Sequence, residues 1–413
     1  MYLLKRFCGP RFDRINAILD QYYGYLNRYV NLIASASYPF PEVVDALANP
    51  FTAFPCEGLP GARYFPATAA LDAVELAGEE MVLRLFGLDL EYRATIQPHS
   101  GTQANQIVYN AVLGREDVVL SLQPSHGGHI SHTTLVGRRN RAIHYKATAE
   151  GSLDYEEIAQ LARDHRPRLI IAGSSSLPRA IDFARLGSIA AEVGALLHAD
   201  LSHTALFVMT NCHPPVFPFA DFATFNTMKN LRGPCGGVLV YRSTLAKEVA
   251  RSLFPVTQGG PSENTLFAKV VCFTKLLETD LRPYASAILS NAQVIATSLL
   301  ERGIEVVAGG TDSHLLLVDL RRGPLTGIEA ESLCEQSHIL LNRNLVRDDP
   351  RPPWVTSGVR IGTSCITTLG YSLHDTKKLA EKLASILLER MPIPLHEIED
   401  LLAKQSSVTP VWR

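Results

Sequence analysis

The spacing of apolar and polar positions predicts a chain that alternates strands and helices over its central part, from about residue 70 to residue 245. Short apolar runs predict strands at residues 117–122, 168–172, 195–199, 222–227 and 237–241. Apolar positions at helical spacing predict helices at 155–164 and 186–193. Such alternation indicates a mostly parallel sheet covered by helices. Ligands of these sheets bind beyond the carboxyl ends of the strands, so the polar residues after the strands are the functional candidates.

The two flanks of this region carry different patterns. Residues 12–33 predict one amphipathic helix, and residues 40–67, rich in Pro, Gly and aromatic residues, predict a structured loop. After a helical stretch at 262–302, a second pattern predicts a smaller α+β domain with strands at 303–307, 313–320 and 358–362 and helices at 329–336 and 375–389. We therefore predict an N-terminal arm, a large domain and a small C-terminal domain at residues 1–40, 41–285 and 286–413.

Composition narrows the class of protein. The 413 residues carry 39 Lys+Arg against 41 Asp+Glu, which gives no reason to expect a nucleic-acid partner. No run approaches the ~20 apolar residues that cross a bilayer, and the N-terminus does not resemble a signal peptide. The seven cysteines are odd in number and lack CxxC spacing, so a disulfide framework is not expected and a cytoplasmic location is.

Two motifs predict an anion site and a charged strand end. Residues 98–105, PHSGTQAN, precede a helical pattern, and Ser100, Gly101 and Thr102 there could present backbone N–H groups to a phosphate or simply cap the helix. The apolar run GALLHA ends in Asp200. A carboxylate at that point could pair with a protonated pyridine nitrogen and keep the ring an electron sink, or could cap the next helix.

A third motif, TMKNLRGPCGG at 227–237, places Lys229 between an apolar strand and a glycine-rich turn. A partly desolvated lysine has a lowered pKa and can form a Schiff base, although a surface lysine at a strand end is the commoner case. Together, in this order, the three motifs are the signature of a fold-type I pyridoxal-phosphate enzyme. His126, His129 and His132 lie close together, but no carboxylate or Cys completes a metal site in the sequence, so no metal is expected.

At this point the sequence resembles the serine hydroxymethyltransferase family from Asn31 to about Thr367. The matching segments are NLIAS (31–35), EGLPGARY (57–64), QPHSGTQAN (97–105), SHGGHISH (125–132), DLSH (200–203), KNLRGPCGG (229–237), QGGP (258–261), GGTDSHLLLVDL (309–320), NRN (342–344) and TSGVRIGTSCIT (356–367). The resemblance implies a large domain with a mostly parallel sheet of seven-stranded type flanked by helices, and a smaller C-terminal α+β domain. It also implies pyridoxal 5′-phosphate as cofactor and tetrahydrofolate as co-substrate.

The resemblance implies roles for matching residues. The cofactor would be held by Ser100, Gly101, Thr102, His129, Ser175, Asp200, His203 and Lys229, with His129 stacked on the ring and Ser175 and His203 near the ring hydroxyl. Arg360 and Ser35 would bind the substrate carboxylate. Glu57 would serve as acid or base near the β-hydroxyl. Tyr64, Ile130 and Asn344 would line the folate site.

The resemblance further implies a homodimer, or a dimer of dimers, with shared active sites. The loop with Glu57 and Tyr64 would reach the neighbouring subunit's site. Gly259 and Gly260 would give backbone N–H groups to the neighbouring subunit's phosphate.

Four positions depart from the family pattern. Pro55 and Phe65 each stand where the family has a tyrosine, Met228 replaces a histidine, and Cys235 replaces an arginine. Phe65 and Cys235 together remove a phenol and a guanidinium that would face each other, so neither polar group is left unpaired. We interpret the four changes as a remodelled pocket that accepts a larger or less polar substrate than serine.

Three functions remain open at this stage. The first is hydroxymethyl transfer between serine, or an α-substituted analogue, and tetrahydrofolate. The second is a folate-independent threonine aldolase or transaldolase of a specialised, natural-product pathway. The third is a non-catalytic relative, disfavoured because the electron-sink and Schiff-base residues are all present.

Overall fold

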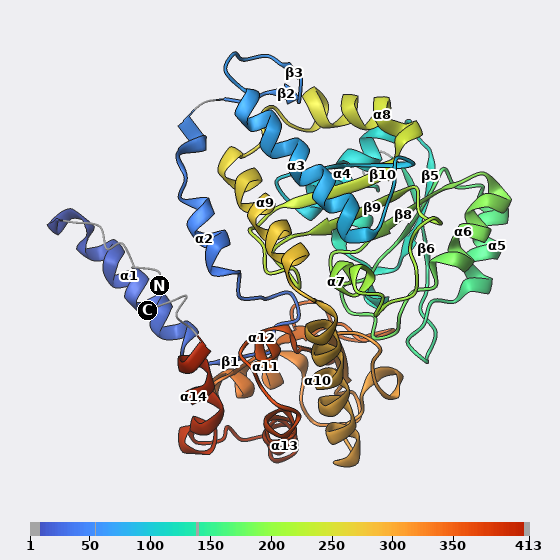
Figure 1. Ribbon diagram of the computed structural model, residues 1–413. Coiled ribbons are helices and arrows are strands. Elements are labelled where there is room, and N and C mark those ends of the chain that lie inside the picture. The colour runs from blue at the N-terminus through green and yellow to red at the C-terminus, as the bar shows by residue number, and fades with distance from the viewer. Residues whose placement is uncertain (1–8, 54, 138–139, 409–413) are drawn as a thin grey trace. The chain divides into compact units, whose positions relative to one another are not determined.

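The computed structural model describes residues 9–53, 55–137 and 140–408, which form two compact units (Figure 1). The larger unit is Ser37–Ser286, and the smaller unit joins the chain before Ser37 to the chain from Ala287 onward. Residues 1–8 lie outside the described residues. They include Cys8 and the start of the N-terminal segment that, by its sequence, is not expected to be a signal peptide.

A seven-stranded sheet forms the centre of the larger unit. Its order is β4, β10, β9, β8, β7, β5 and β6. The strand bounds in that order are Tyr92–Thr95, Gly237–Arg242, Phe222–Asn226, Leu196–Asp200, Leu169–Ala172, Val118–Leu122 and Arg141–Tyr145. Only β10 runs antiparallel to its neighbours β4 and β9, and the other pairs in the sheet are parallel. The predicted fold class is therefore confirmed, and all five predicted strands of this sheet are present.

The sequence pattern missed β4 and β6, which are the two edge strands of the sheet. In β6 only the last residue, Tyr145, is buried, so the segment RAIHY lacks the continuous apolar run of the inner strands. Edge strands are commonly short and partly polar, because one side of their backbone faces away from the sheet.

Side chains on both faces of the sheet are buried. Val119, Ile171 and Leu239 share one apolar cluster with residues of α4 (Gly101–Val112). Alternate strand residues point to the opposite face, and Leu120 and Ile170 there are fully buried as well. Other helices of the unit that pack on the strands or on one another include α2 (Pro41–Leu47), α3 (Ala69–Phe86), α5 (Tyr155–His165), α6 (Phe183–Val193), α8 (Ala246–Arg251) and α9 (Glu263–Glu278).

The smaller unit is built on a three-stranded antiparallel sheet. Its order is β11 (Leu315–Asp319), β14 (Gly358–Gly362) and β13 (Asn342–Asn344). A second pair joins β1 (Val30–Asn31) to β12 (Ile339–Leu340) in parallel. Its helices include α1 (Asp13–Leu26), α11 (Gly327–Gln336), α12 (Ser364–Thr368), α13 (Leu373–Glu389) and α14 (Glu399–Val408).

Two predicted elements of the flanks need correction, and a third, the helical stretch at 262–302, is confirmed. The helix expected at 12–33 ends at Leu26, because Val30 pairs with Ile339 and tertiary pairing overrides the helical pattern. The strand expected at 303–307 is only a single bridge between Val306 and Val318. The helical stretch at 262–302 is two helices, α9 and α10 (Arg282–Glu301).

The described cysteines Cys56, Cys212, Cys235, Cys272, Cys334 and Cys365 are free thiols. Within the described ranges, no helix combines the length and the hydrophobicity that crossing a bilayer requires.

The start of α6 offers a test of the fold. The Asp182 carboxylate accepts hydrogen bonds from the backbone N–H groups of Ala184 and Arg185 at 3.0 and 3.1 Å. Asp182→Ala removes this cap, and we expect it to lower the free energy of unfolding by about 1 kcal/mol. Urea denaturation followed by circular dichroism measures the change. Asp164→Ala, an exposed position in the last turn of α5, is the control; equal losses in the two variants would contradict the capping role.

Candidate active site

The motif at residues 98–105 forms the connection from β4 to α4. Ser100 is the N-cap of α4, and its Oγ accepts a hydrogen bond from the Gln103 N–H at 3.1 Å. Gly237 at the start of β10 donates its N–H to the Pro98 carbonyl at 2.9 Å. A Cβ at Gly237 would lie 2.2 Å from the Ser100 carbonyl oxygen, so this close approach requires glycine. The helix start is thus held against the sheet, with N–H groups suited to an anion.

Asp200 is the last residue of β8 and is almost fully buried. Its Oδ2 accepts hydrogen bonds from His132 Nε2 at 2.9 Å and from Asn105 Nδ2 at 2.8 Å. Its Oδ1 accepts one from the Ser202 N–H at 3.0 Å. Burial alone would raise the pKa of Asp200, but these hydrogen bonds, led by His132, hold that pKa well below its usual range. The carboxylate is therefore ionised at neutral pH.

A chain of hydrogen bonds continues from Asp200 into the protein. Asn105 donates to Ser131 Oγ at 3.0 Å, and Ser131 Oγ lies 2.7 Å from His129 Nδ1. Thr224 Oγ1 on β9 donates to Asn105 Oδ1 at 2.5 Å and lies 2.8 Å from His198 Nε2. Burial lowers the pKa of His198 to about 3, so its imidazole is neutral. The network fixes the orientations of Asn105 and His129 around the carboxylate.

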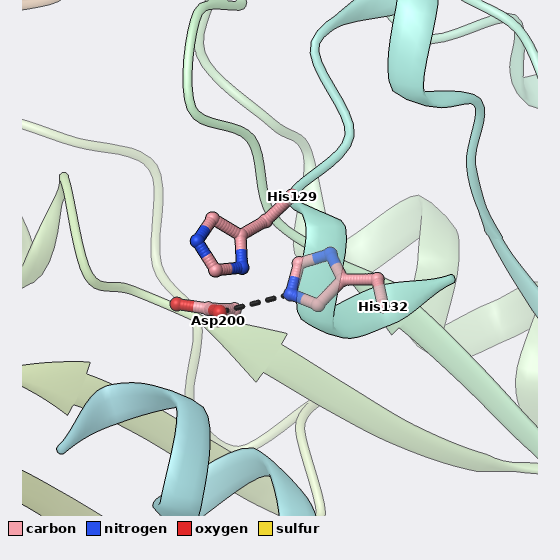
Figure 2. Close-up of side chains that lie close together, drawn as sticks. All are labelled: His129, His132 and Asp200. Atoms are coloured by element: carbon pink, nitrogen blue, oxygen red, sulfur yellow. Dashed lines mark hydrogen bonds and ion pairs between the residues drawn. The ribbon is translucent and has the colours of Figure 1, made fainter. Parts of the chain in front are cut away.

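His129, His132 and Asp200 lie together, and Figure 2 shows both imidazoles beside the carboxylate. One ligand atom from each residue lies within 4.8 Å of the others. The expectation that no carboxylate accompanies these histidines is therefore wrong, because β8 brings Asp200 to them from a distant part of the sequence. Asp200 and His132 already bond one another, which ties both side chains to the site predicted for the cofactor ring.

Lys229 lies in the turn between β9 and β10, as its motif predicts, and is partly buried. Its carbonyl accepts the Arg232 N–H at 3.1 Å, and the Gly233 N–H closes the turn on the Thr227 carbonyl at 2.9 Å. Asn230 donates its side-chain N–H to the His203 carbonyl at 2.7 Å. Lys229 and His203 are thus held in adjoining loops, after two neighbouring parallel strands.

Ser175 follows β7 and stands one strand further along the sheet. Its N–H donates to the Gly127 carbonyl at 2.9 Å, which joins its loop to the segment before His129. A Cβ at Gly173 would lie 2.5 Å from the Asp200 carbonyl oxygen, so the two strand ends approach closely. The candidate residues after β5, β7, β8 and β9 therefore gather at one edge of the sheet.

Glu57, Tyr64, Gly259 and Gly260 form a second group in the larger unit. A Cβ at Gly259 would lie 3.2 Å from Glu57 Oε1, and Gly260 packs on the Cys56 backbone. The Gly260 carbonyl lies 3.2 Å from His99 Nε2, next to the start of α4. Tyr64 is 73% exposed and packs on Phe254 with ring centroids 5.1 Å apart. The four residues that the resemblance assigns to a neighbouring subunit's site thus share one surface region.

The four positions that depart from the family pattern are all exposed in the single chain. Met228 is 41% exposed and Phe65 is 37% exposed. Pro55 and Cys235 are exposed as well. The resemblance places all four next to cofactor or substrate, at positions where a side chain can change without disturbing the buried network.

Arg360, Asn344 and Ser35 belong to the smaller unit. Arg360 on β14 is 9% exposed, and burial lowers its pKa to about 10, so it stays protonated at neutral pH. Its Nε donates to Asn342 Oδ1 at 3.2 Å, on β13, whose last residue is Asn344. The Gly362 N–H donates to the Leu32 carbonyl at 2.7 Å, which holds the segment leading to Ser35 against β14.

His132, Asn105 and Ser202 hold Asp200, yet the sequence interpretation gave them no role. All three lie inside or beside the motifs that carried the resemblance. The signal that could have identified them is the need of any buried carboxylate for several donors.

Comparison with known proteins identifies the family to which this chain is similar. The family model described as serine hydroxymethyltransferase matches residues 12–383. The chain is 39% identical over 366 residues to serine hydroxymethyltransferase 2 of Pseudomonas putida, and the match covers 87% of each chain.

The His132–Asp200 hydrogen bond predicts a pH effect. His132→Phe keeps a ring of similar size but removes the donor, so the pKa of Asp200 rises. The resemblance implies that Asp200 pairs with the cofactor ring, so an ionised Asp200 would support the ring above its lowered pKa, and the contact would be lost as the pH falls through that pKa. We therefore expect the variant to lose cofactor at a higher pH than the wild type, and to bind it roughly tenfold more weakly at neutral pH.

Absorbance of the bound cofactor after desalting at a series of pH values measures this effect. His165→Phe, at the end of α5, is the control. An unchanged pH of cofactor loss in His132→Phe would contradict the role of the hydrogen bond.

Proposed function

Because the chain belongs to the serine hydroxymethyltransferase family, we propose that it transfers the hydroxymethyl group of serine, or of a close analogue, to tetrahydrofolate with the help of pyridoxal 5′-phosphate. The observation that carries this proposal is the buried, ionised Asp200 at the end of β8. Lys229 follows the adjacent strand, β9, and α4 packs on β9 and β10 of the same sheet. Asp200, Lys229 and the start of α4 suit, respectively, the pyridine nitrogen, the aldehyde and the phosphate of the one cofactor molecule.

The residues of the larger unit fit the cofactor. Ser100, Gly101 and Thr102 at the start of α4 would hold its phosphate, and Asp200 its ring nitrogen. The Lys229 amine would hold its aldehyde carbon. When bound, the cofactor supplies an electron sink for the carbanion left when the Cα–Cβ bond breaks. Because Asp200 stays ionised, it would favour the protonated form of the ring nitrogen and so preserve the electron sink.

The substrate is positioned by other residues. Arg360 would bind the amino-acid carboxylate with two parallel N–H groups, and Ser35 would add a further donor. Glu57 would remove the proton from the β-hydroxyl as the Cα–Cβ bond breaks, and return a proton in the reverse direction. Tyr64, Ile130 and Asn344 would line the folate site. The exposed ring of Tyr64 and the exposed Ile130 side chain suit a ligand with a flat pterin ring.

We propose a homodimer, or a dimer of dimers, as the active form. Glu57, Tyr64, Gly259 and Gly260 would complete the neighbouring subunit's site, with the two glycines donating N–H groups to its cofactor phosphate. Support comes from their shared location on one surface region and from the 73% exposure of Tyr64, an aromatic residue that a second chain would cover. We place the enzyme in the cytoplasm, where its buried thiols, such as Cys272 and Cys334, stay reduced.

The pocket changes bear on the substrate and leave the reaction class as it is. Phe65 and Cys235 replace a phenol and a guanidinium by an apolar ring and a small thiol. We propose that the enzyme prefers a serine analogue with a larger or less polar substituent than serine itself. Neither a folate-independent aldolase nor a non-catalytic relative is favoured, because the chain retains Glu57, Tyr64 and Asn344 together with Lys229.

Folate dependence tests the proposed reaction. We expect glycine to change the visible spectrum of the enzyme with bound cofactor only weakly, and tetrahydrofolate to increase the long-wavelength absorption strongly. Asn344→Ala should need roughly tenfold more folate for the same response, the loss expected for one polar contact. Asn264→Ala, an equally hydrogen-bonded asparagine on α9, is the control. A full response to glycine that folate leaves unchanged would favour the aldolase instead.

Restoring the family residues tests the remodelled pocket. The double variant Phe65→Tyr with Cys235→Arg should raise kcat/KM for serine relative to α-methylserine by about tenfold or more, because a paired phenol and guanidinium return together. Each single variant should gain less, since it leaves one polar group without its partner. Initial rates with both amino acids give the ratio. No gain for serine in the double variant would exclude this account of the pocket.

A further inference from the structure

Lys269 on α9 is a fully buried lysine, 1% exposed, which is rare for this residue type. Its Nζ donates hydrogen bonds to three backbone carbonyls: those of Ile96 at 2.5 Å, Pro98 at 2.9 Å and Gly237 at 2.9 Å. An ammonium group has three N–H donors, so each one has an acceptor. The three carbonyls therefore take the place of water around the Lys269 Nζ group.

These carbonyls belong to the two segments that form the phosphate loop. Ile96 and Pro98 follow β4 and lead directly to Ser100, the N-cap of α4. Gly237 begins β10 and gives its own N–H to the Pro98 carbonyl at 2.9 Å. Lys269 thus joins three peptide groups that set the course of the chain into the helix start.

The neighbouring glycines show that the site is shaped around the lysine. A Cβ at Gly236 would lie 2.2 Å from Lys269 Cε, and a Cβ at Gly237 would lie 2.2 Å from the Ser100 carbonyl oxygen. One glycine therefore makes room for the lysine and the next makes room for the loop. Burial also lowers the pKa of Lys269 to about 7, whereas the charges of Glu75 and Cys235 act in the opposite direction.

We infer that Lys269 is a positioning residue for the cofactor phosphate, because it turns the carbonyls of Ile96 and Pro98 toward itself and away from the anion. The N–H groups of the same two peptides bond within the loop, that of Gln97 to Thr95 Oγ1 and that of His99 to Gln103 Oε1. The loop is thus held on both sides, and the first turn of α4 is left to present its N–H groups to the phosphate. An apolar side chain at position 269 could fill the same space but could not orient the carbonyls. This inference rests on the proposed phosphate site at the start of α4.

The test compares pyridoxal 5′-phosphate with pyridoxal, the same aldehyde without a phosphate. In Lys269→Met, affinity for pyridoxal phosphate should fall by about tenfold or more, as for a lost charge-assisted hydrogen bond, while affinity for pyridoxal changes little. Inorganic phosphate should likewise compete with pyridoxal phosphate for the apoenzyme only at about tenfold higher concentration. Absorbance and fluorescence titrations of the apoenzyme measure both. Lys275→Met, on the same helix and paired with Glu42 at 3.0 Å, should match the wild type.

The outcomes distinguish a failure of the proposed phosphate site from a failure of the proposed role of Lys269. If wild-type protein binds pyridoxal as tightly as pyridoxal phosphate, the proposed phosphate site fails. If the wild type discriminates and Lys269→Met discriminates equally well, the inference on Lys269 fails, whether or not overall affinity falls. Should Lys269→Met not fold, Gly236→Ala displaces the lysine without removing it and should weaken pyridoxal phosphate binding selectively; equal weakening of both ligands would overturn the inference.

Discussion

A buried, ionised carboxylate at the end of β8 imposes the main constraint on the larger unit. Removing the charge of Asp200 from water is costly unless several donors surround it. His132, Asn105 and Ser202 meet that need, and they come from the segment after β5, from α4 and from the loop after β8. Asn105 lies only five residues after Ser100, the N-cap of α4. One helix therefore both stabilises the Asp200 charge, proposed to hold the ring nitrogen, and has the N-terminus proposed to bind the phosphate.

A second buried polar network connects α3 to the segment between β4 and α4. Arg63 pairs with Glu75 at 2.6 Å, and Glu75 accepts a hydrogen bond from Gln97 at 2.7 Å. Gln97 lies between the two residues whose carbonyls Lys269 holds, and its Oε1 accepts from Gln258, just before Gly259. The loop that would complete a neighbouring subunit's site is thus anchored to the same residues as the chain's own phosphate loop.

The sequence predicted the inner strands, and with them the positions of Asp200 at the end of β8 and of Lys229 after β9, because apolar runs follow local rules that need no tertiary information. It did not predict β4, which is only four residues long, or β6, in which only Tyr145 is buried. It also missed the end of α1, where Val30 pairs with distant Ile339. Partners of Asp200 and the carbonyls around Lys269 were also missed. Such contacts join residues up to 173 positions apart, and no periodicity along the chain records them.

The positions that depart from the family pattern lie outside both networks. Pro55, Phe65, Met228 and Cys235 are exposed in the single chain, whereas Asp200, His132, Asn105, Glu75 and Lys269 are buried. Changing a buried partner would leave a charge uncompensated, at a cost of about 3–5 kcal/mol, while changing an exposed side chain usually costs less than about 0.5 kcal/mol. Selection for a new substrate could therefore act on the rim of the pocket at little cost in stability. Under the proposed roles, the electron-sink chemistry would stay with the buried residues, and the exposed ones would determine specificity.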